Sequence, residues 1–211
     1  MRGDPMKTTV LSVQMIPNAD PMLLCQLGLD ENLRSLGIIT TDCDDATYIA
    51  LDEATKAADV TVSYGRSFYA GAANASTPNA GEVIGILAGT TPGAVKSGME
   101  AVISALSRVG FEEAKGVPYL AHTVSRSGSF LAKEAGVAEG EALAYLIAPP
   151  LESMYAMDAA LKAADVKLCK LYAPPSETNF GGGLLSGTQS ACDAACAAFA
   201  QAVAEVAGMP R

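Results

Sequence analysis

The sequence is poor in basic residues, contains one histidine and lacks tryptophan. Fourteen lysines and arginines stand against 23 acidic residues, which gives a formal net charge of −9. Nucleic acids and anionic lipids bind basic surfaces, so the composition predicts no nucleic-acid partner and no membrane partner. The single histidine, His122, lies in an apolar stretch. It is interpreted as a hydrogen-bonded core or strand residue, which disfavours a histidine-based zinc site and a Ser-His-Asp triad.

Long apolar runs are also missing, although half of the 211 residues are apolar and only 18% are charged. A membrane-spanning helix needs about 20 consecutive apolar residues. The nearest candidate, residues 194–207, is interrupted by Gln201 and Glu205. The sequence therefore predicts a soluble protein whose surplus apolar surface lies at interfaces between subunits.

The five cysteines are an odd number without the spacing of a disulfide framework. This pattern favours a reducing cytoplasm over an oxidising compartment. Cys192 and Cys196 lie four residues apart on an expected helix, and they are interpreted as two small core residues rather than half of a metal site. The sequence predicts no bound metal and no cofactor.

The chain repeats itself. DEATKAADV at 52–60 recurs as DAALKAADV at 158–166, with seven identities in nine at an offset of 106. Self-similarity at this separation indicates two copies of one domain rather than a short-period solenoid. A polar stretch at 112–116 marks the boundary, so we expect one domain over 1–114 and another over 115–211.

Each copy is expected to run strand, helix, strand, helix, strand, strand, helix, which gives an α/β (α+β) fold. The order follows from helical and alternating apolar spacing and from start signals such as Thr90-Thr91-Pro92. Asn18 or Asp20 is expected to cap the short helix of the first copy. Ser127 or Ser129 is expected to do so in the second.

The two copies differ most at one turn, where residues 42–45 read Asp-Cys-Asp-Asp and residues 148–151 read Ala-Pro-Pro-Leu. Helix capping accounts for one aspartate. It does not account for three, because neighbouring carboxylates raise each other's pKa. Two interpretations of the acidic turn remain. It binds Mg²⁺ or Ca²⁺ through oxygen ligands, although it lacks EF-hand spacing, or it lines an acidic channel for an organic cation.

A glycine run at 181–183 has no Lys-Ser/Thr of a phosphate-binding loop. Two interpretations remain. The run forms a hairpin or bulge that needs positive φ angles, or it forms a loop whose backbone lines a passage.

Nearly the whole chain resembles the tandem-domain shell proteins of ethanolamine-utilisation bacterial microcompartments. The strings that carry this resemblance are SLGIITTDCDDATYIALDEATKAADV, YGRSFYAGAANAST, AGEVIGILAG, VSRSGSFLAKEAG, AYLIAPPLE and PPSETNF. The resemblance implies a tandem duplication of a circularly permuted microcompartment shell domain and a homotrimer that mimics a hexamer. It further implies a structural, non-enzymatic tile that meets other shell proteins edge to edge in a cytoplasmic microcompartment.

The resemblance also assigns residues. It implies that Lys56 and Lys162 make contacts at the tile edges. Small acidic channels that admit ethanolamine would be formed by Asp44, Asp45, Glu82, Phe111 and Thr178. A central pore would be gated by loops at 68–77 and 177–183, with the residues Phe68, Tyr69, Ala70, Gly71, Asn74, Glu177, Asn179, Phe180, Gly181, Gly182 and Gly183.

Two other classes of function are weighed against the shell protein. One is a small-molecule module that binds or senses an amine without assembling into a shell. The other is a metal-assisted hydrolase that uses Asp42, Asp44 and Asp45. The hydrolase is the weaker alternative, because the sequence supplies neither a matched base nor a second cluster.

Overall fold

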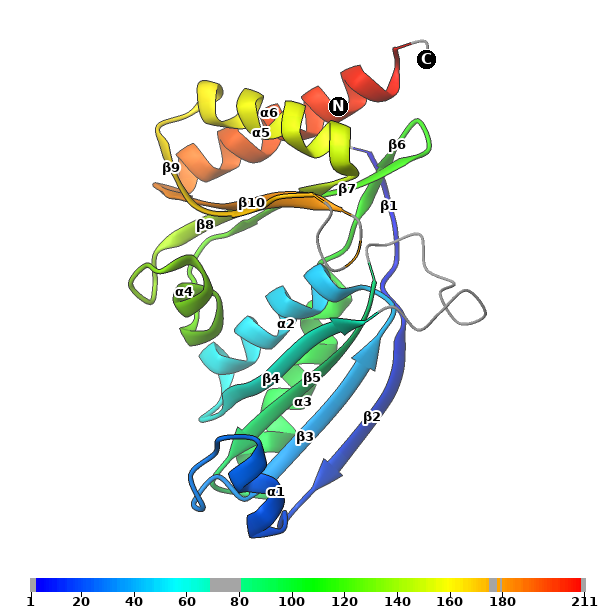
Figure 1. Ribbon diagram of the computed structural model, residues 1–211. Helices are drawn as coiled ribbons and strands as arrows, with labels where there is room; N and C mark the ends of the chain where they lie inside the picture. The colour runs from blue at the N-terminus through cyan, green and yellow to red at the C-terminus, as the bar shows by residue number, and fades with distance from the viewer. Residues whose placement is uncertain (1–2, 69–80, 175–177, 179, 210–211) are drawn as a thin grey trace.

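Two antiparallel sheets, each with its own helices, build the protein (Figure 1). The structure is a computed structural model that describes residues 3–68, 81–174, 178 and 180–209. The first half contains β2 (Val10–Ile16), α1 (Pro21–Gln26), β3 (Ser35–Thr41), α2 (Asp44–Ala57), β4 (Thr61–Phe68), β5 (Glu82–Gly89) and α3 (Pro92–Leu106).

The second half repeats this order, as the duplication predicts. The predicted order of strands and helices along the chain is therefore confirmed in both halves. Its elements are β7 (Val117–Val124), α4 (Ser129–Ala135), β8 (Ala142–Ala148), α5 (Pro150–Ala163), β9 (Val166–Tyr172), β10 (Gly181–Gly187) and α6 (Gln189–Ala207).

Two short strands that precede residue 115 join the second sheet. The first sheet has the order β2-β3-β5-β4, and the second has the order β1-β6-β7-β8-β10-β9. Here β1 (Asp4–Pro5) pairs with β6 (Glu112–Ala114), which forms a hairpin with β7. The predicted boundary between 114 and 115 falls at the turn of this hairpin, and the division into two domains stays a prediction.

Side-chain caps explain where several helices begin. The Thr91 hydroxyl accepts a hydrogen bond from the Ala94 amide at 3.1 Å before α3. Asp20 likewise caps α1, as one of the two predicted alternatives. The prediction that a serine caps α4 is wrong, because the N-cap is Gly128 and no side chain of that cap forms the hydrogen bond.

The glycine run belongs to a strand rather than to a hairpin turn or a loop. Gly181, Gly182 and Gly183 are buried in β10, between β8 and β9. Gly182 has φ +150°, and a Cβ atom there would lie 1.8 Å from the Leu146 carbonyl oxygen. Glycine at this position therefore permits the close approach of β10 to β8.

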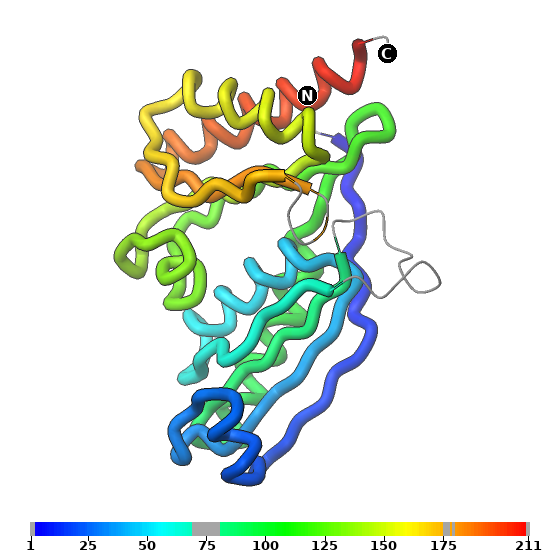
Figure 2. Tube along the Cα trace, viewed as in Figure 1, coloured from blue at the N-terminus to red at the C-terminus, as the bar shows by residue number. Residues whose placement is uncertain are grey.

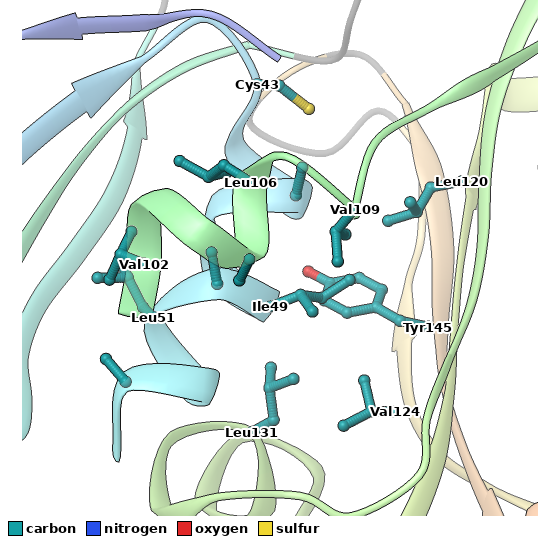
Figure 3. Packing of buried hydrophobic residues seen from close by; sticks show 14 of the residues in the cluster. Cys43, Ile49, Leu51, Val102, Leu106, Val109, Leu120, Val124, Leu131 and Tyr145 are labelled. Atoms are coloured by element: carbon teal, nitrogen blue, oxygen red, sulfur yellow. The ribbon is translucent and has the colours of Figure 1, made fainter. Parts of the chain in front are cut away.

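The largest buried cluster joins the two halves. Figure 3 shows Ile49 and Val109 of the first half near Leu120, Val124 and Leu131 of the second. The Cα trace shows the short helix α4 next to α2 (Figure 2). Because the halves share this core, burial of apolar surface holds them together. No helix within the described ranges is long and apolar enough to cross a bilayer.

Candidate functional site

A cavity of about 860 Å³ opens between the two halves. Its walls come from the start of α2, from β4 and α4, and from the ends of β8 and β9. Small-molecule sites in proteins have volumes of this order and lie preferentially at domain interfaces. The charged side chains in the wall are Asp44, Asp45, Arg66, Lys133, Glu134 and Lys170.

Two adjacent carboxylates of the cavity wall occupy the first turn of α2. Asp44 and Asp45 are only 4% and 7% exposed. Asp44 accepts hydrogen bonds from the Ser67 hydroxyl and from the Asp45 amide, the latter at 2.8 Å. Asp45 accepts a hydrogen bond from the Tyr145 hydroxyl at 2.8 Å. The positive end of the helix dipole favours negative charge here, and the two hydroxyl partners orient the carboxylates without neutralising them.

Burial raises the pKa of both carboxyl groups. For Asp45 the charge of Asp44 raises the pKa further, and the hydrogen bond from Tyr145 opposes that rise. Burial and the nearby Asp45 also raise the pKa of the Tyr145 phenol, which therefore remains a hydrogen-bond donor. A buried pair of this kind is stabilised by whatever brings positive charge to it, a proton or a cation.

Another part of the wall carries an internally balanced pair. The Lys170 ammonium of β9 lies 2.5 Å from the Glu134 carboxylate of α4. The Tyr172 hydroxyl donates to the same carboxylate at 3.3 Å, and the ammonium lies 5.5 Å from the centre of the Tyr172 ring. Glu134 thus has a cationic partner, whereas the donors described above for Asp44 and Asp45 are hydroxyl and amide groups. Arg66 and Lys133 also line the cavity.

Aromatic rings surround these charges. Tyr48 and Phe130 lie with their ring centroids 6.1 Å apart, and Tyr145 and Tyr172 lie 6.2 Å apart. All four residues line the cavity. Aromatic faces next to carboxylates suit an organic ammonium ion, which is attracted by both. The arrangement therefore supports binding of a small organic cation.

The third aspartate of the acidic turn has a separate role. Asp42 accepts a hydrogen bond from the Thr9 amide at 2.6 Å, and it does not line the cavity. Among the described residues, no group of three or more His, Cys, Asp or Glu side chains is placed to hold a metal ion. The arrangement thus gives no support to the metal-assisted hydrolase.

The structure brings three of the five predicted channel residues together, because Asp44, Asp45 and Thr178 line the cavity. Glu82 and Phe111 are not among the lining residues. Glu82 begins β5 opposite Phe68 of β4.

Both of these residues nevertheless lie close to the wall. A Cβ atom on Gly81, next to Glu82, would lie 2.5 Å from the Thr178 methyl group. Phe111 is buried and packs against Phe180, a lining residue, with ring centroids 6.0 Å apart. The Phe111 carbonyl already accepts a hydrogen bond from the Met6 amide at 2.7 Å.

The predicted gating residues fall into three groups. Phe68 ends β4 and is 39% exposed, and Phe180 lines the cavity. Gly181 to Gly183 are strand residues, so a gating loop over 177–183 is wrong for these three positions. The remaining residues lie outside the described part of the chain; they are Tyr69, Ala70, Gly71, Asn74, Glu177 and Asn179.

Several cavity residues were missed by reasoning from the sequence: Ser67, Glu134, Tyr145 and Lys170. Tyr145 carried a usable signal, because it places one hydroxyl in the fully buried strand ALAYLIA. A buried tyrosine hydroxyl normally has a hydrogen-bond partner. The partner itself, Asp45, lies 100 residues away in the sequence.

The two predicted tile-edge lysines have different surroundings. Lys56 hydrogen-bonds the Arg126 carbonyl at 2.8 Å and lies 3.5 Å from the buried Asp52 carboxylate, with 21% of its side chain exposed. Lys162 pairs with Asp158 at 2.6 Å, and its side chain is 74% exposed. The first lysine therefore joins the two halves of the chain, whereas the second is available at the surface.

Comparisons with known proteins agree with one another. A model of the BMC domain matches residues 35–119. The chain is 59% identical to the bacterial microcompartment shell protein EutL of Clostridium perfringens (strain 13 / Type A), over 100% of this chain and 99% of that protein. It is 46% identical to EutL of Salmonella typhimurium, over 98% and 96%. The crystal structure of ethanolamine utilization protein EutL from Leptotrichia buccalis C-1013-b superposes with a TM-score of 0.92 at 60% identity, covering 98% of this chain and 97% of that one.

Proposed function

The chain belongs to the bacterial microcompartment shell proteins of the EutL type, and from that premise we propose that it forms a homotrimeric tile whose interdomain cavity admits small amines. As a member of this family it is a structural component of an ethanolamine-utilisation microcompartment shell. The similarity covers the whole chain, which favours shell assembly over an amine sensor that acts alone. No catalytic step is assigned to it.

The observation that carries the proposal is the buried pair Asp44 and Asp45 in the cavity wall. A unit charge about 4 Å from an ammonium gains about 4 kcal/mol at an effective dielectric constant of about 20, before the cost of dehydrating the ammonium. Ethanolamine is a small ammonium ion, so the pair attracts it. Passage also requires that the ion leaves again, so net binding is weak.

The other parts of the proposal concern assembly and gating. Trimers meet other shell proteins at their edges, and the exposure of Lys162 makes it the better candidate for such contacts than Lys56. A central pore is gated by the loops around 68–77 and 177–180. Glu82 belongs to the same channel as its third carboxylate and Phe111 lies beside it, which the closeness of Gly81 to Thr178 and of the Phe111 ring to Phe180 supports.

Calorimetry with ethanolamine tests the channel. The double substitution Asp44→Asn and Asp45→Asn keeps the shape of both side chains and removes their charge, so we expect ethanolamine binding to weaken by tenfold or more. Asp42→Asn is the matched control, because it changes the same turn outside the cavity and retains an acceptor for the Thr9 amide. If the double variant binds ethanolamine as the wild type does, the assignment of the channel is wrong.

A further inference from the structure

We propose that Asp44 and Asp45 share one proton when the cavity is empty, and that an ammonium ion entering the cavity displaces this proton into the solvent. This inference rests on the proposed amine channel and describes how its site is regulated. The affinity for ethanolamine then depends on pH, because the ion and the proton compete for the same pair of carboxyl groups.

The two carboxyl groups lie side by side where solvent hardly reaches them. Both side chains are buried in the first turn of α2, and they are hydrogen-bonded to each other. A hydrogen bond between two carboxyl groups needs a proton on one of them, because a carboxylate only accepts. Ionising both is also costly, since like charges in a shared buried site oppose each other. One shared proton is therefore the stable state of the empty pair.

The donors described around the pair orient it but bring no positive charge. Ser67 donates its hydroxyl hydrogen to Asp44, so it accepts the hydrogen of the Tyr48 hydroxyl, 2.9 Å away. The Tyr145 hydroxyl donates to Asp45 at 2.8 Å, and Figure 3 shows its ring extending toward Ile49 of α2. These donors are neutral hydroxyl groups, so the charge of the pair has to be balanced by a proton or a bound cation.

The other charged groups of the cavity wall offset the pair only weakly. Lys170 of β9 and Glu134 of α4 pair with each other. Arg66 and Tyr64 of β4 and Lys133 of α4 line the cavity, but all three are exposed. Solvent screens the charges of exposed side chains much more than those of buried ones. In the described part of the chain, α3 contributes no residue to the wall.

The remaining titratable groups near the pair are neutral or add negative charge. Burial raises the pKa of the Cys43 thiol and of the Tyr145 and Tyr172 phenols, so these groups stay protonated. Glu82 of β5 adds a further carboxylate to the proposed channel, which favours the shared proton. His122 is the strand partner of Tyr145 in β7 and does not line the cavity. It needs its own control, because an ordinary histidine titrates at a pKa of about 6.5.

An ammonium ion can replace the shared proton without changing the net charge of the site. Its N–H groups donate to both carboxylates, and its charge offsets the second negative charge that appears when the proton leaves. Part of the attraction is used to ionise the second carboxyl group. The exchange therefore keeps net binding weak, as passage through a channel requires.

The direction of the pH dependence follows from the raised pKa of the pair. Burial raises the pKa of both carboxyl groups, and the charge of Asp44 raises that of Asp45 further. Below the raised pKa the ion has to expel a proton, so its affinity should fall about tenfold for each unit by which the pH drops. Above the raised pKa the affinity should be constant. Ethanolamine stays an ammonium ion throughout, because primary alkyl amines titrate well above neutral pH.

Calorimetry in two buffers counts the released protons. Ethanolamine is titrated into the full-length protein in phosphate and in MES, whose ionisation enthalpies differ, so the difference in observed enthalpy gives the protons released per bound ion. At about pH 6 an ordinary aspartate carries a proton in only about 1% of molecules. The wild type should nevertheless release about half a proton or more per bound ion at about pH 6.

Two variants should move the release in opposite directions. Tyr145→Phe removes a donor that favours the ionised pair, so the pH of half-maximal release should rise. Asp45→Asn leaves a single carboxyl group without a charged neighbour, so this pH should fall by about one unit or more. Asp42→Asn and His122→Gln are the matched controls, because both residues lie outside the cavity wall, and both variants should release protons like the wild type.

The outcomes separate this inference from the proposed channel. Wild-type binding with the same enthalpy in both buffers at about pH 6 would overturn the shared proton while leaving the channel intact. Loss of proton release in His122→Gln would also overturn it, because the proton would then belong to the histidine. A wild type that does not bind ethanolamine would instead overturn the proposed channel itself.

Discussion

Asp52 offers the sharpest test of how α2 of the first half and α4 of the second half are joined. Its carboxylate lies on α2 of the first half, is fully buried, and accepts the amides of Gly128 and Leu131 at the start of α4. It thereby supplies the cap that α4 lacks in its own sequence. Hydrogen bonds to a charged acceptor contribute about 1.5–3 kcal/mol each.

Two substitutions should give graded losses. Asp52→Ala removes both acceptors, so we expect the free energy of unfolding to fall by about 4 kcal/mol. Asp52→Asn keeps one acceptor and turns an NH₂ group toward the other amide, so we expect a loss of about 2 kcal/mol. Urea denaturation at one fixed protein concentration measures both, since the stability of an oligomer depends on concentration.

Glu53→Ala is the matched control for Asp52. Glu53 is the next residue on α2, pairs with the same Lys56 and has a side chain that is 39% exposed. Exposed pairs of this kind contribute about 0–1 kcal/mol, so the loss should stay below about 1 kcal/mol. A similar loss for Asp52→Ala and Glu53→Ala would refute the role of Asp52 as the cap of α4.

Two further predictions concern the carboxylate pair. Because burial and Asp44 raise the folded pKa of Asp45, the resulting stabilisation is fully present below the ordinary aspartate pKa of about 4 and is lost as the pH rises through the raised value. Asp45→Asn removes this loss. The free energy of unfolding of the variant, measured by urea denaturation, should therefore rise relative to that of the wild type as the pH rises. A difference between the two that does not change with pH would contradict this. Tyr145→Phe should lower the free energy of unfolding by about 1–2 kcal/mol. It should also raise the pKa of Asp45 further, since the hydrogen bond from the Tyr145 hydroxyl lowers that pKa. The control Tyr64→Phe, at an exposed tyrosine, should change neither the free energy of unfolding nor the pKa of Asp45.

Local patterns determined most of the fold. The repeat at an offset of 106 and the alternation of apolar residues predicted the order of strands and helices in both halves. The cap of α4 could not be predicted in this way, because the capping carboxylate lies 76 residues from Gly128. The glycine run was interpreted correctly only in part, for a related reason: a positive φ angle was expected and occurs at Gly182, but the place of the run inside a strand was not expected. The close approach of β10 to β8 that requires Gly182 depends on sheet pairing and not on neighbouring residues.

The site was predictable only in part for the same physical reason. The acidic turn was visible because three carboxylates follow one another almost directly in the sequence. The sequence could not separate their roles, because the Thr9 amide holds Asp42 whereas the cavity receives Asp44 and Asp45. Glu134 and Lys170 are ordinary charged residues in sequence, and the fold alone brings them together across 36 positions.

The pairing of β1 with β6 has a consequence for synthesis on the ribosome. Asp4 and Pro5 form the edge strand of the second sheet and pair with Glu113 and Glu112, which are translated much later. The Gly3 amide beside them donates hydrogen bonds to the Glu112 carboxylate and the Tyr119 hydroxyl, each at 2.9 Å. The pairing of β1 with β6 can therefore form only after the first half of the chain has been translated. Splitting the gene between residues 114 and 115 would leave the downstream product without the two outer strands of its sheet, β1 and β6. The second sheet is therefore complete only when both halves belong to one chain.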